Sequence, residues 1–106
     1  MLAATSSEFG NLQTLRLALS LAQRDPALIP EPLQEQVKMI IRQASEIISD
    51  PHRINANTLP ESIALAYVMR SSPELVRDVT KLIELERLDT AIAGATLQHL
   101  DAAFVA

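Results

Sequence analysis

The sequence predicts an all-α protein, a compact four- or five-helix bundle, and three observations support that fold class. Apolar residues make up 48% of the chain, and they recur with the 3.6-residue period of an α-helix. Proline is followed by glutamate three times, which is typical of a first helical turn. Only two glycines occur in 106 residues, which disfavours the tight turns of β-hairpins. A chain of this length is predicted to form one domain, residues 1–106.

These signals predict five helices, at about 7–24, 31–49, 59–70, 73–87 and 90–104. Ser/Thr-x-x-Glu capping patterns mark three of the starts: Thr5 to Glu8, Thr58 to Glu61, and Ser71 to Glu74. Asp25-Pro26 and Asp50-Pro51 mark two of the ends, because the residue before a proline avoids the helical conformation. Segment 26–30 is then a short link, and segment 51–58 is a loop.

The first predicted helix has an apolar arc wider than one packing face needs. The arc covers about 220°, whereas a helix that faces a core usually shows a stripe of about 100°. It consists of Leu12, Leu15, Leu17, Ala18, Leu19, Leu21 and Ala22. Leu17 and Leu21 lie on the flank furthest from Leu12 and Leu19, so we predict that they form an interface. The alternative is that the last helix, with Leu97, Leu100 and Phe104, covers this flank.

The other four helices differ in how clearly they show an inward face. The second has a seam of Leu33, Val37, Ile40, Ala44 and Ile47, widened by Ile41 and Ile48. The fourth has Leu75, Val76, Val79, Leu82 and Ile83, and the fifth has Ile92, Ala93, Leu97, Leu100 and Phe104. The third, with Ile63, Ala66 and Tyr67, is apolar almost throughout. A helix that is apolar on all sides is predicted to be buried by its neighbours.

Composition limits the classes of function. The net charge is −4, so the chain has no general electrostatic attraction for nucleic acid or for an anionic membrane. Cysteine is absent, which excludes disulfides and thiolate chemistry. No apolar run approaches the ~18 residues of a membrane span, and the first residues lack the features of a signal peptide. We therefore expect a cytoplasmic protein that binds neither nucleic acid nor membranes.

Three residues are the candidates for acid–base chemistry, and each has a simpler structural explanation. His52 follows Asp50 in the predicted loop, without the further ligands that zinc needs. His99 lies at the border of an apolar face, where a packing role is usual. Glu86 projects into the apolar face of the fourth helix if that helix continues, and burial would suit a general acid. If the helix ends before it, Glu86 reaches solvent or an arginine, and this is the interpretation we favour.

The sequence thus predicts a small helical module that acts by binding a protein, either a partner or a second copy of itself, through its apolar helix faces. We expect no enzymatic activity, no cofactor and no metal. The first alternative is a DNA-binding regulator that uses 59–70 and 73–87 as a helix-turn-helix. Its second helix, however, lacks the Asn, Gln and Arg cluster that reads base edges. The second alternative is an enzyme with Glu86 or His99 as an acid or base inside the bundle.

Overall fold

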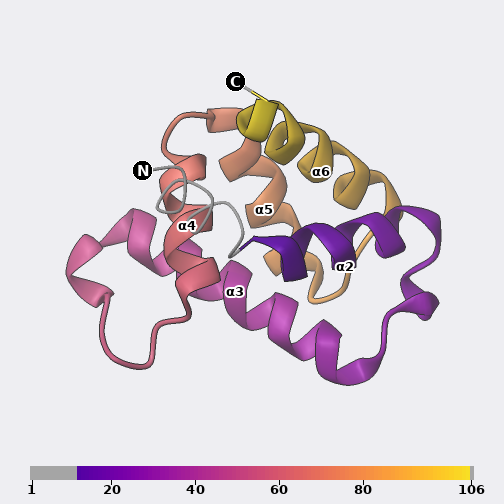
Figure 1. Ribbon diagram of the computed structural model, residues 1–106, viewed down its shortest axis with the longest axis horizontal. Helices are drawn as coiled ribbons and strands as arrows, with labels where there is room; N and C mark the ends of the chain where they lie inside the picture. The colour runs from indigo at the N-terminus through magenta and orange to yellow at the C-terminus, as the bar shows by residue number, and fades with distance from the viewer. Residues whose placement is uncertain (1–11, 106) are drawn as a thin grey trace.

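The computed structural model describes residues 12–105, and side chains up to residue 103. Within that range the elements are α2 (Gln13–Arg24), η1 (Pro26–Leu28), α3 (Glu31–Ser49), η2 (Pro51–Arg53), α4 (Pro60–Met69), α5 (Pro73–Leu85) and α6 (Thr90–Val105) (Figure 1). The described residues contain no strand, so the all-α prediction is confirmed. Helix 31–49 was predicted to the residue, and 59–70, 73–87 and 90–104 to within two residues. The predicted start near residue 7 and the Thr5 to Glu8 pattern lie outside the described residues.

The two Asp-Pro pairs end helices as predicted, and each then starts a short 3₁₀ turn. Asp25 follows α2 and Asp50 follows α3, and both have extended backbones. The Asp25 carboxylate accepts a hydrogen bond from the N–H of Ala27 at 3.0 Å, and Asp50 does the same for His52 at 3.1 Å. One residue therefore ends a helix through its backbone and caps the next turn through its side chain.

Two of the predicted capping residues are wrong. The residue that caps α5 is Ser72, whose hydroxyl accepts from the N–H of Leu75 at 3.1 Å. Ser71 instead donates its N–H to the carbonyl of Val68, at the end of the preceding helix. Thr58 accepts from the N–H of Asn55 within the loop at 3.0 Å, and α4 begins without a side-chain cap. Proline at the first helical position sets both starts, because it needs no hydrogen-bond acceptor there.

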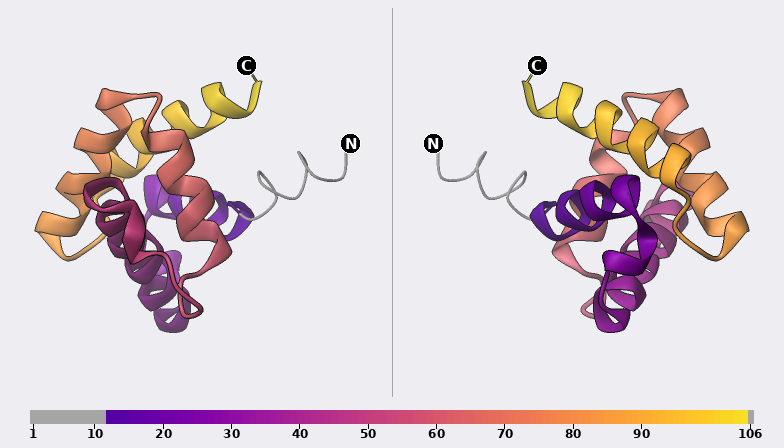
Figure 2. Two further views of the ribbon diagram at one scale, coloured as in Figure 1. Left: turned by 90° about the vertical axis from the view of Figure 1, so that its left-hand side faces the viewer. Right: turned by 90° about the vertical axis from the view of Figure 1, so that its right-hand side faces the viewer.

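Helix α6 packs between α2 and α5, and α3 packs along α4 and also contacts α2 and α5 (Figures 1 and 2). Helices α2 and α6 run antiparallel. At one end of their contact Arg16 donates from Nη2 and Nε to Oδ1 of Asp101, at 2.7 and 3.1 Å. At the other end Gly94 faces Gln23, and a Cβ there would lie 3.3 Å from its Nε2. A side chain at position 94 would therefore contact the Gln23 side chain, which is exposed.

All five α-helices of the described residues contribute to the core. In α2, α3, α5 and α6 the buried positions follow the pattern that the periodicity predicts. The fully or almost fully buried apolar residues of these helices include Leu15, Leu19, Val37, Ile40, Ala44, Ile47, Leu75, Val79, Leu82, Ala93 and Leu100. Phe104 lies outside the described side chains. The radius of gyration of the Cα atoms is 12.8 Å, close to the ~13 Å of a folded domain of about 100 residues.

Helix α4 departs from its prediction. Its inward face buries Ser62, Leu65, Ala66, Val68 and Met69. The opposite face is open: Tyr67 is 67% exposed and Ile63 is 39% exposed. The expectation that neighbours bury this helix on all sides is therefore wrong. In the left view of Figure 2, α4 crosses the side of the bundle that faces the viewer, and no other described helix lies in front of it.

Candidate functional site

A side-chain hydrogen-bond cluster fixes which face of α4 points outward. Oε1 of Gln43, on α3, accepts from the Ser62 hydroxyl at 2.8 Å and from the N–H of Leu59 at 3.0 Å. Its Nε2 donates to the carbonyl of Asn57 at 3.4 Å. Ser62 is fully buried, so this cluster joins the first turn of α4 to the middle of α3. The rotation of α4 about its own axis is thereby set.

The α4 outer face consists of Pro60, Ile63, Ala64 and Tyr67. At 100° per residue these side chains share an arc of about 100°. Glu61 is the one charged residue of the helix, and it lies outside this arc. Tyr67, the only tyrosine of the chain, is the most exposed of the large apolar side chains described. The sequence does not predict this site, because a helix that is apolar on nearly all sides gives no indication of which side faces the core. The uncharged stretch 62–69 was the available signal.

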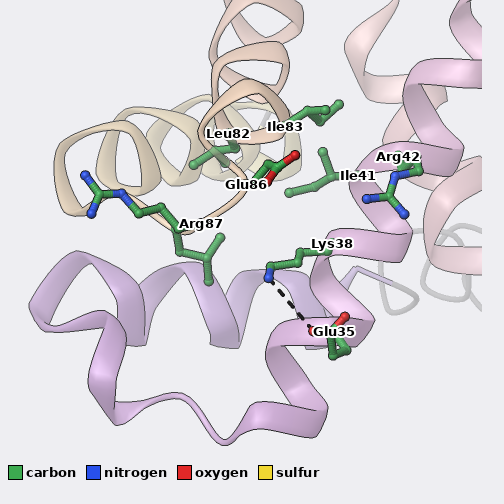
Figure 3. Close-up of a pocket in the computed structure, with 9 residues that line it drawn as sticks. Glu35, Lys38, Ile41, Arg42, Leu82, Ile83, Glu86 and Arg87 are labelled. Carbon is green, nitrogen blue, oxygen red and sulfur yellow. Dashed lines mark ion pairs between the residues drawn. The ribbon is translucent and has the colours of Figure 1, made fainter.

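Two hollows lie along the contact between α3 and α5. The first hollow has a volume of about 490 Å³ and is lined by Glu35, Lys38, Ile41, Arg42, Leu82, Ile83, Glu86, Arg87 and Leu88 (Figure 3). The second has a volume of about 360 Å³ and is lined by Ile48, Met69, Arg70, Pro73 and Val76. Residue numbers rise along α3 as they fall along α5, so the helices are antiparallel. We refer to the two hollows together as the α3–α5 groove.

The floor of the groove is apolar and its rim is charged. Ile41, Leu82 and Leu88 are buried, and Ile48, Val76 and Ile83 are half-buried. On the rim, Lys38 pairs with Glu35 at 3.9 Å. Figure 3 shows the Glu86 carboxylate near Ile83 and Ile41, with the Arg87 guanidinium pointing away from it. The groove combines apolar contact area with surface charge.

Glu86 reaches this rim because α5 ends sooner than the pattern predicts. The helix ends at Leu85, and Glu86 adopts a left-handed conformation with φ of 57°. Its side chain is exposed. Helical geometry placed Glu86 in the apolar face, and that position is wrong because the backbone turns before it. The favoured interpretation, in which the helix ends and Glu86 reaches solvent, is confirmed.

The two histidines lie in different surroundings: His99 is beside two carboxylates of α5, and His52 is exposed. Nε2 of His99, on α6, lies 3.5 Å from Oε2 of Glu74 and 3.6 Å from Oδ2 of Asp78, both on α5. His99 is half-buried, so this cluster links the two helices at their surface. His52 is exposed in η2. No three His, Asp or Glu residues of the described chain are arranged to hold a metal ion.

The helix that would contact DNA in the helix-turn-helix alternative, α5, exposes both acidic and basic side chains. Helices α4 and α5 are joined by residues 70–72. The exposed side chains of α5 include Arg77 and Lys81, but also Glu74 and Glu84. Acids interleaved with bases weaken the attraction for phosphates that non-specific DNA binding requires. The geometry therefore offers no observation in favour of this alternative.

The predicted interface residues of α2 differ in exposure. Leu17 is 57% exposed, among exposed Gln13, Ser20 and Arg24. Leu21 is half-buried and packs against the core. Helix α6 contacts the other flank of α2, through Asp101 and Gly94. The alternative was that the last helix covers the flank of both Leu17 and Leu21, and it is wrong for Leu17, which is exposed. The Phe104 side chain lies outside the described residues, and the interface at Leu17 and Leu21 stays a prediction.

Comparisons with protein-family models, with curated proteins and with solved structures gave no match. Among the described helices, none is both long and apolar enough to cross a membrane.

Proposed function

We propose that this chain is a protein–protein interaction module that binds a partner, or a second copy of itself, through the α4 outer face. The observation that carries the proposal is the exposure of Ile63 and Tyr67 on a helix with a single charged residue. An exposed helix face of a monomer is ordinarily polar, so an uncharged face indicates a surface that another protein covers.

The chemistry of the face supports this function. Tyrosine is among the residues that contribute most to binding energy at interfaces, because its ring buries a large area at a small cost in conformational entropy. Ile63 lies one turn before Tyr67, so the two side chains present one continuous contact area. The cluster around Gln43 orders α4 in advance, which reduces the entropy lost on binding. Leu17 and Leu21 are the smaller candidate surface.

Photo-crosslinking tests the proposal. We expect Tyr67→benzoylphenylalanine to give a discrete protein adduct on irradiation, either in purified protein or in an extract of the native host. The same replacement at Arg77, which is also exposed, is the matched control and should give none. Adding Ile63→Glu should abolish the adduct at position 67. Equal labelling from both positions, or labelling that Ile63→Glu leaves unchanged, contradicts the proposal.

A further inference from the structure

We propose that the α3–α5 groove is a second docking site, which binds an acidic amphipathic helix of a partner protein. The site is distinct from the α4 outer face, and the inference goes beyond the function proposed above. Three features of the groove support it: the separation of its hollows, its apolar floor and the sign of the charge around it.

The separation of the hollows matches the repeat of an amphipathic helix. Ile41 and Ile83 line the first hollow, and Ile48 and Val76 line the second. Ile41 and Ile48 are seven residues apart on one helix, which is a distance of about 10 Å. Apolar side chains at positions i and i+7 of a bound helix have the same separation, with those at i+3 and i+4 between them. One helix lying along the groove therefore reaches both hollows.

The floor gives such a helix apolar contact area that the domain leaves open. Ile48, Val76 and Ile83 are half-buried and pack against the core on one side. Their remaining surface faces the hollows that they line. Anchoring side chains from a partner would complete the burial of these residues, and apolar burial stabilises association.

The charge around the groove is opposite in sign to that of the whole chain. Lys38, Arg42, Arg70 and Arg87 line the two hollows, together with Glu35 and Glu86. These are four of the nine Lys and Arg residues, but only two of the thirteen Asp and Glu residues. Bases are therefore concentrated here on a chain with a net charge of −4. Complementary charge directs encounter and selects partners, so the polar face of the bound helix is acidic.

An apolar floor also distinguishes this partner from a nucleic acid. Binding of single-stranded nucleic acid combines cations with aromatic platforms on which bases stack. The residues that line the two hollows include no aromatic side chain. Aliphatic hollows fit leucine-like anchors instead.

Two designed peptides test the proposal by fluorescence anisotropy. Both carry leucine at positions i, i+3, i+4 and i+7 of a helix, with glutamate at the polar positions of one and lysine at those of the other. We expect the acidic peptide to bind at least about tenfold more tightly, with an affinity that falls as salt rises. Equal affinity for the two peptides, or no binding of the acidic one, overturns the proposal.

Matched charge reversals locate the site. We expect Arg42→Glu to weaken binding of the acidic peptide by about tenfold, and Lys81→Glu, on the exposed surface outside the groove, by less than twofold. Amide and methyl chemical-shift changes should centre on Ile41, Ile48, Val76 and Ile83. Changes centred elsewhere, equal effects of the two reversals, or displacement of the peptide by a single-stranded oligonucleotide would each overturn the proposal. Crosslinking from position 67 tests the α4 outer face separately, because Arg42→Glu leaves that face unaltered.

Discussion

Helices α3 and α4 lie side by side but differ in what their sequences reveal. Helix α3 alternates its buried residues, such as Val37, Ile40 and Ala44, with charged ones on the opposite face. Helix α4 has one charged residue in ten positions and is apolar almost throughout. Its two faces nevertheless have opposite surroundings, since Leu65 is fully buried and Tyr67 is 67% exposed.

The difference shows that the inward face of a helix can be predicted from the sequence only where one face is polar and the other apolar. A high apolar content alone does not predict it. In α3 the contrast predicts both the helix and its inward face. In α4 the composition predicts a helix but no direction, and the direction comes from the Gln43 cluster. Helix α4 has apolar side chains that the core does not bury, and we interpret these side chains, on the α4 outer face, as an interaction surface.

The largest expected effect on stability is the difference between truncating a buried isoleucine of α3 and truncating an exposed isoleucine of α4. Ile40→Ala should lower the free energy of unfolding by about 2–5 kcal/mol, because it leaves a cavity in the core. Ile40 is fully buried. Ile63→Ala should cost less than about 1 kcal/mol, because Ile63 already contacts water. Urea denaturation monitored by circular dichroism measures both values. Equal costs would show that the two faces do not differ as described.

Removing the acceptor that orients α4 should have the next largest effect. We expect Gln43→Ala to cost about 1–3 kcal/mol, because it leaves the buried Ser62 hydroxyl and the Leu59 N–H without their partner. Ser62→Ala removes one of those donors. The double variant should therefore cost less than the sum of the two single variants. Strict additivity in urea denaturation would exclude a coupled cluster.

Features that depend on a few neighbouring residues can be predicted from the sequence, whereas features that depend on contacts between distant segments cannot. The end of α3 depends on one dipeptide, Asp50-Pro51, and was predicted to the residue. The end of α5 has no such signal, and 73–87 was predicted two residues too long because Glu86 is not a residue type typical of a left-handed turn. The groove depends on which helices become neighbours. Periodicity within one helix carries no information about that.

The site residues show the same limit. The sequence pointed to Leu17 and Leu21 through the width of an apolar arc, and one of the two, Leu17, is well exposed. It did not point to Ile63 or Tyr67, because burial of the third helix was assumed from its composition. Exposure depends on the number and arrangement of neighbouring helices, and therefore on contacts between distant segments.

The C-terminal end of α5 gives a smaller test. Glu86→Gly should raise the free energy of unfolding by about 0.5–1 kcal/mol, because glycine adopts a left-handed conformation without the steric cost of a Cβ. Glu84→Gly, two residues earlier and inside the helix, is the control and should lower it by about 1 kcal/mol. Thermal and urea denaturation of both variants measure the values. Destabilisation by Glu86→Gly would contradict the position assigned to the end of α5.

The smallest expected effect on stability comes from Leu17, and it compares the two exposed apolar surfaces directly. Leu17→Glu should change the free energy of unfolding by less than about 0.5 kcal/mol, because the side chain is 57% exposed. Leu21→Glu should cost about 1 kcal/mol or more, because Leu21 packs partly against the core. Leu17→Glu is therefore the variant that separates association from folding.

Sedimentation velocity then shows which surface mediates any self-association. If the chain self-associates through the α4 outer face, Tyr67→Glu should abolish the dimer and Leu17→Glu should leave it intact. A dimer that survives Tyr67→Glu but is lost with Leu17→Glu would assign the interface to α2. A single exposed leucine among polar side chains provides little area, whereas Ile63 and Tyr67 adjoin on an uncharged face. Because larger apolar areas stabilise association more, we expect Tyr67→Glu to have the larger effect.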